Sequence, residues 1–199
     1  MFIQMVQGEC SRRIEMRRLV DNWCTVIADE EGWLGGTYGF TDDNRFVGIV
    51  RFTDSQACIE AAQRPFAASF WAQALELLDS DVEIHQSDDV TLMFDGGSED
   101  AGFVQVLTGQ LKDAAQMRYL VADQDMTAML HATRPEILGA TLAISQDGTF
   151  TETIAFTDEA LARRGEAIRM PEQVQRTLEE AVADVEYLDL RNPWFASHS

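Results

Sequence analysis

The fold is decided by the stretch FVGIVRFTD at residues 46–54, which recurs as FTETIAFTD at residues 150–158. Phe46, Phe52, Thr53 and Asp54 are repeated at a shift of 104 residues. Further identities on both sides keep a shift between 101 and 104: they include Phe2, Gln4, Gly8, Met16, Arg17, Leu19, Val20, Leu34, Gly35, Thr37, Asp43 and Asp81. A period of about 100 residues matches a whole small domain, so the chain holds two copies of one unit.

Each copy is predicted to contain a strand, a helix, a hairpin of two strands, a second helix and a closing strand. In the first copy the apolar pattern places these at 2–8, 12–28, 32–40 with 45–52, 53–78 and 82–86. We expect the turns at Asn44 and Gly148 to take positive φ, and Asp54 and Asp158 to start helices that break near Pro65 and Pro171. This βαββαβ order predicts an α+β protein of two ferredoxin-like units, 1–94 and 102–199, joined by a linker at 95–101.

The hairpin strands are apolar on both faces, which indicates that each sheet is buried on both sides. We therefore expect the two antiparallel sheets to pack face to face as a barrel within one chain. The last residues, with Trp194 and Phe195 after Pro193, are expected to pack on the body of the protein or on a second molecule.

The composition limits the possible partners. The 199 residues contain 34 acidic and 15 basic side chains, for a net charge of −19. This balance argues against binding to nucleic acid or to an anionic membrane. Cys10, Cys24 and Cys58 all lie in the first copy without metal-type spacing, which indicates reduced thiols in a cytoplasmic protein and no metal site.

The chain resembles the dimeric α/β-barrel superfamily, and within it the antibiotic biosynthesis monooxygenase-like branch. The resemblance is carried by GWLGGT at 32–37, the stretch at 46–54 and RPF at 64–66 with Phe70 and Trp71, with weaker echoes at 137–141, 154–158 and 170–171. In that superfamily two single-unit chains pair their sheets, and ligands lie between the sheet and the helices of a unit. Members include cofactor-free oxygenases of aromatic substrates, haem-degrading enzymes and proteins without known activity.

The resemblance disfavours haem, because the histidine that haem-degrading members carry on the second helix corresponds to Phe70 here. We expect no cofactor. The other histidines, His131 in the second copy and His198 near the end of the chain, do not replace it. His85, in the closing strand, is either a structural residue or a catalytic one.

The aromatic residues of the first copy predict where a ligand would bind. We expect a pocket for a small apolar or aromatic molecule, lined by Trp23, Tyr38, Phe66, Phe70 and Trp71. Tyr38, His85 and Asn22 are the candidate catalytic residues of a cofactor-independent monooxygenase-like enzyme, with Trp71 beside them. The second copy replaces Trp33 and Tyr38 by Ile137 and Leu142, so we expect it to be a filled structural partner.

The alternative is a non-catalytic structural or interaction protein that has lost this pocket, with the aromatic residues filling a core. No acid–base pair, Ser-His-Asp set or Cys-His set can be recognised, which favours this alternative. The oligomeric state, monomer or homodimer, stays open.

Overall fold

A computed structural model of the chain describes residues 1–94, 96–97, 99–168 and 172–197. The chain divides into two compact units: residues 1–88 with 193–199, and residues 89–192. Asp95 and Ser98 of the predicted linker, the predicted helix break at Pro171, and His198 lie outside the described residues.

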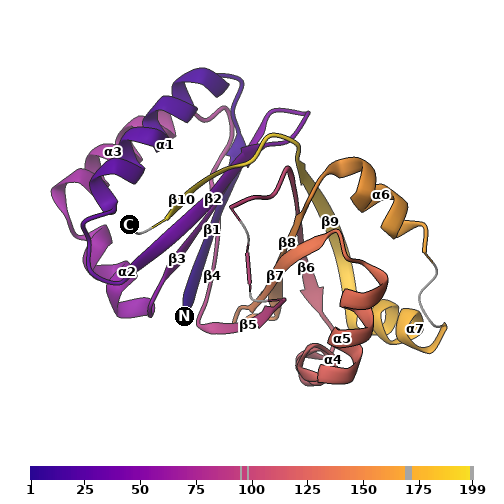
Figure 1. The fold of residues 1–199 in the computed structure, drawn as a ribbon. Coiled ribbons are helices and arrows are strands. Elements are labelled where there is room, and N and C mark those ends of the chain that lie inside the picture. The colour runs from indigo at the N-terminus through magenta and orange to yellow at the C-terminus, as the bar shows by residue number, and fades with distance from the viewer. Residues whose placement is uncertain (95, 98, 169–171, 198–199) are drawn as a thin grey trace. The chain divides into compact units, whose positions relative to one another are not determined.

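The first unit combines one sheet with three helices that cover one of its faces (Figure 1). Its elements are β1 (Phe2–Glu9), α1 (Arg13–Ile27), β2 (Trp33–Phe40), β3 (Arg45–Phe52), α2 (Ser55–Ala62), α3 (Pro65–Leu77), β4 (Glu83–Ser87) and β10 (Trp194–Ser197). The strand order is β10-β2-β3-β1-β4, and all neighbouring strands are antiparallel.

The second unit repeats this arrangement. Its elements are β5 (Asp89–Met93), β6 (Phe103–Leu111), α4 (Ala114–Ala122), α5 (Gln124–Thr133), β7 (Ile137–Ile144), β8 (Thr149–Phe156), α6 (Glu159–Glu166), α7 (Glu172–Ala181) and β9 (Val182–Leu190). The antiparallel strand order is β5-β7-β8-β6-β9, the same order of equivalent strands as in the first unit. The predicted α+β class with tandem ferredoxin-like units is confirmed.

Local sequence signals act as predicted in both copies. Asn44 and Gly148 have φ values of 67° and 85° at the two hairpin turns. Asp54 accepts a hydrogen bond from the backbone N–H of Ala57, and Asp158 does the same for Leu161. These caps satisfy N–H groups that the first helical turn leaves unpaired. Pro65 begins α3, where its missing N–H costs no helical hydrogen bond.

The register of the strands shows that the duplication is kept residue by residue. Across the first sheet Val6 pairs with Gly48, and Gly48 pairs with Tyr38. Across the second sheet the corresponding pairs are Leu107 with Glu152 and Glu152 with Leu142. The residues of the first row and those of the second therefore occupy equivalent positions in the two copies, although their side chains differ.

Each sheet has a fifth strand that the basic βαββαβ unit lacks. The segment after β4 forms β5 and pairs with β7 of the second sheet, while the segment after β9 forms β10 and pairs with β2 of the first sheet. The predicted units, 1–94 and 102–199, are continuous segments of the chain, whereas the compact units of the structure group the strands of each sheet. The two divisions therefore differ at residues 89–94 and 193–197. The strand that follows the first copy thus belongs to the second sheet, and the strand that follows the second copy belongs to the first sheet.

The face of the first sheet that turns away from its helices is apolar, as the alternation indicates. Ile3, Met5, Val47 and Ile49 on this face are each exposed by 2% or less. The packing of the two sheets against each other stays a prediction.

None of the helices in the described ranges has the length and apolar character needed to cross a membrane.

Candidate pocket of the first unit

A cavity of about 150 Å³ lies between the sheet and the helices of the first unit. Its walls come from β1, β2, β3 and β4 on one side and from α1, α2 and α3 on the other. Ile59 and Ala62 on α2 and Gln86 on β4 are its exposed lining residues. The mouth therefore lies between α2 and the edge strand β4.

Small residues on both walls leave this space empty. Gly48 is the floor residue beside Tyr38, and a Cβ added there would lie 3.2 Å from Cδ1 of the tyrosine ring. A Cβ at Gly36 would overlap the tyrosine hydroxyl oxygen. On the helical side, buried Ala67 and Ala74 face the same cavity. The sequence thus makes room for the ring of Tyr38 to lie along the sheet, with a void above it.

Aromatic side chains form the wall between α1 and α3. The ring of Phe70 lies 4.6 Å from that of Trp23 and 5.5 Å from that of Trp71, measured between centroids. All three line the cavity. Phe66, also predicted for this site, packs on Trp23 at 5.4 Å but is not one of the lining residues. Such rings offer flat apolar faces to a ligand.

The hydroxyl of Tyr38 is the most unusual polar group of the pocket. Tyr38 is 2% exposed, and its buried hydroxyl oxygen has no hydrogen-bond partner among the described residues. Burial, and next the nearby Cys24 thiol on α1, hold the pKa of Tyr38 well above its usual range. The Cys24 thiol is near enough to interact with the hydroxyl and to affect the ionisation of both groups, but sulfur is a weak acceptor and no well-formed hydrogen bond joins them. The phenol is therefore a neutral donor without a strong acceptor among the described residues.

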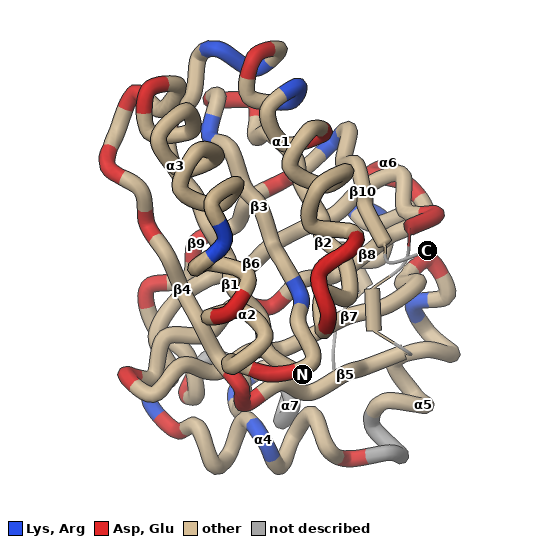
Figure 2. The backbone as a smooth tube through the Cα atoms, turned by 90° about the vertical axis from the view of Figure 1, so that its left-hand side faces the viewer, with Lys and Arg blue, Asp and Glu red and all other residues tan. Residues whose placement is uncertain are grey.

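The other polar lining groups are also neutral. Gln4 and Gln86 are cross-strand partners on β1 and β4, and both line the cavity. Burial raises the pKa of the Cys58 thiol to about 11, so it is protonated at neutral pH. No Asp, Glu, Lys, Arg or His belongs to the described lining, although acidic residues are spread over the helices and loops (Figure 2).

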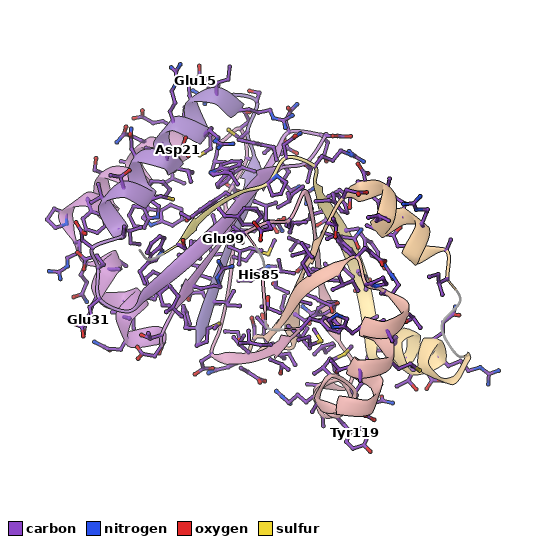
Figure 3. All side chains as sticks on the ribbon, in the orientation of Figure 1. Glu15, Asp21, Glu31, His85, Glu99 and Tyr119 are labelled. Carbon is purple, nitrogen blue, oxygen red and sulfur yellow. The ribbon has the colours of Figure 1, made fainter. Side chains whose placement is uncertain are left out.

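Two of the candidate catalytic residues lie elsewhere. His85 pairs with Met5, one position out of phase with the lining pair Gln4 and Gln86, so it projects from the opposite face of the sheet. Figure 3 shows His85 on the side away from α1. Asn22 is exposed on α1, in an open depression of about 310 Å³ that it shares with Glu15, Gln73 and other surface residues. Neither residue lines the cavity.

Trp194 is a residue of this site whose partner the sequence did not indicate. On β10 it pairs with Tyr38, and the two rings stack at 5.9 Å. The Arg17 guanidinium lies 4.2 Å above the Trp194 ring, and Phe40 lies 5.8 Å away. Trp194 therefore packs against the outer side of the tyrosine that lines the pocket. The run of Trp194 and Phe195 after Pro193 was its only sequence signal.

The equivalent surface of the second unit has different chemistry. Leu142 stands in place of Tyr38, and Glu152 stands in place of Gly48. Glu152 lies among apolar neighbours, with Leu107 and Leu142 beside it across the sheet. Burial raises the pKa of Glu152 to about 7. The expected filled core of this copy stays a prediction.

Within the described ranges, no three His, Cys, Asp or Glu side chains gather as metal ligands.

Comparisons with known proteins identify the fold through solved structures. No family model matches the chain, and no curated protein matches it. A proposed monooxygenase of Lactobacillus acidophilus NCFM is 13% identical, with a TM-score of 0.73 over 100% of this chain and 96% of that one. A proposed monooxygenase of Fusobacterium nucleatum is 12% identical, with a TM-score of 0.76 over 98% and 94%. An anthrone oxidase-like protein is 9% identical, with a TM-score of 0.71 over 100% and 93%.

These full-length matches confirm the expected resemblance at the level of the fold. The chain has the same α+β architecture as these proteins, with both units in one polypeptide. At such low sequence identity a structural similarity indicates a shared architecture but does not indicate a shared chemical activity.

Proposed function

We propose that the first unit binds one small, neutral aromatic molecule in the cavity between its sheet and its helices. The observation that carries this proposal is an apolar cavity of about 150 Å³ walled by Trp23, Phe70 and Trp71. An apolar cavity of about this size elsewhere stays dry and accepts a benzene-sized ligand. A void in a core costs stability, so a cavity retained beside aromatic rings supports a binding role.

Oxygenation of the bound molecule is the second candidate, because the similar structures are named as monooxygenases and as an anthrone oxidase-like protein. A cofactor-independent oxygenase of this kind removes a proton from its substrate before oxygen reacts. The described lining offers no base for this step, since Tyr38 and Cys58 both have raised pKa values and the remaining groups are amides and apolar side chains. The pocket therefore favours binding over catalysis.

The first prediction tests occupancy of the cavity. Toluene added to the purified chain should bind at one site per chain in a calorimetric titration. Ala74→Leu should abolish this binding, because Ala74 lines the cavity and the larger side chain fills it. The variant should also gain about 0.5–2 kcal/mol of stability in urea unfolding, as cavity-filling changes commonly do.

Ala72→Leu is the matched control, since Ala72 is exposed on the same helix. It should leave toluene binding unchanged. Toluene that binds equally well to the wild type and to Ala74→Leu would show that the ligand site lies elsewhere, and no binding to the wild type would reject the proposal.

A further inference from the structure

The buried hydroxyl of Tyr38 has no oxygen or nitrogen acceptor among the described residues. A buried donor without a partner costs about 1–3 kcal/mol. Tyr38 is 2% exposed, and the nearby Cys24 thiol is a weak acceptor that makes no well-formed hydrogen bond with its hydroxyl. A phenylalanine would fill the same space without this cost, so the hydroxyl points to an acceptor that belongs to a ligand.

The strand register places this hydroxyl at one end of a row of side chains. The hydroxyl lies over Gly36, which pairs with Val50, and Val50 in turn pairs with Gln4. Neighbouring strands lie about 4.8 Å apart, so Gly36 and Gln4 are separated by roughly 10 Å with Val50 between them. A flat ring over Val50 would therefore have the phenol at one edge, and the amide of Gln4, which has no described side-chain partner, at the other.

The charge of the lining limits the ligand further. The described lining contains no ionised side chain in a chain whose net charge is −19. A carboxylate or phenolate would lose its hydration there without gaining a cation. The neutral phenol of Tyr38 can donate to an uncharged oxygen at much lower desolvation cost.

Resting on the binding role proposed above, we propose that the ligand is a neutral one-ring aromatic compound whose polar atom is a hydrogen-bond acceptor, such as a carbonyl oxygen. Tyr38 donates a hydrogen bond from its hydroxyl to that oxygen, and the rings of Phe70 and Trp71 contact the aromatic face. Tyr38 is thus the residue that selects acceptor-bearing ligands over plain hydrocarbons.

The test compares acetophenone, ethylbenzene and benzoate as probes in calorimetric titrations of the full chain at pH 7.5. Acetophenone and ethylbenzene have nearly the same shape, but only acetophenone carries the acceptor. Tyr38→Phe should lower the ratio of acetophenone affinity to ethylbenzene affinity about tenfold. Because the ratio is taken within each variant, a general loosening of the pocket cancels. Benzoate should not bind to either form.

Tyr119→Phe is the matched control, since Tyr119 is 78% exposed on α4 (Figure 3) and should leave the ratio unchanged. Cys24→Ala should also leave the ratio unchanged, because the ligand and not the thiol accepts the hydrogen bond of Tyr38. An unchanged ratio in Tyr38→Phe would overturn this inference while leaving the binding role intact. Tighter binding of benzoate than of acetophenone would also overturn it. Failure of both neutral probes to bind would reject the binding role itself.

Discussion

Trp194→Ala is expected to lower the free energy of unfolding of the first unit by about 3–5 kcal/mol, the usual cost of truncating a buried tryptophan. Trp194 is 8% exposed and packs against Tyr38, Phe40 and Phe46. Its loss also removes the cation–π contact of Arg17. The expected result is a large decrease in the urea midpoint, measured by tryptophan fluorescence and circular dichroism.

Phe195→Ala is the control within the same strand. Phe195 is the neighbouring residue, so its side chain projects from the other face of β10 and lies only partly buried. Trp194→Phe should cost much less than the alanine change, because it keeps a ring and removes an indole N–H that has no described partner. If Trp194→Ala changed the midpoint no more than Phe195→Ala, β10 would not be part of the folded core in solution.

Glu152→Gln is expected to stabilise the protein at pH 8 by up to about 3 kcal/mol. Burial raises the pKa of Glu152 from 4.5 to about 7. The folded chain therefore holds this proton more tightly than the unfolded chain. The stabilisation that protonation provides is complete below pH 4.5 and is lost as the pH rises through 7. Since part of Glu152 stays exposed, water screens its charge and makes this figure an upper value.

The measurement is the difference in unfolding free energy between Glu152→Gln and the wild type at pH 4.5 and at pH 8. The difference should be small at the lower pH and large at the higher one. Glu180→Gln, at an exposed position of α7, should show no such change. A difference for Glu152→Gln that is the same at both pH values would show that this carboxyl is not held in an apolar environment.

The sequence predicts the repeated unit because its signals are local or periodic. Asp54 starts a helix and Asn44 takes positive φ through interactions within a few residues. The sheet that each fifth strand joins could not be predicted in this way. Residues 89–93 and 194–197 are short segments whose partners, β7 and β2, lie far away in the sequence. No local pattern states which sheet a short segment will join.

The sequence predicts the aromatic wall of the candidate site but not its polar groups. Trp23, Tyr38, Phe70 and Trp71 belong to one copy only, and the structure places all four around the cavity. Gln4 and Gln86 gave no signal, because a glutamine in a strand is equally typical of a solvent-facing surface.

The position of His85 depends on which face of β4 its side chain occupies. A shift of one residue in a strand moves a side chain to the other face, and the sequence alone did not fix which face of β4 meets the helices. The pairing of Gln4 with Gln86 fixes that phase and separates His85 from the pocket.

A crystal structure of the chain grown with acetophenone tests the binding role most directly. We expect one molecule between the sheet and α3 of the first unit, with its ring against Phe70 and Trp71 and its carbonyl oxygen within hydrogen-bonding distance of the Tyr38 hydroxyl. A first unit packed solidly by its own side chains, with acetophenone bound only among residues 89–192, would contradict it.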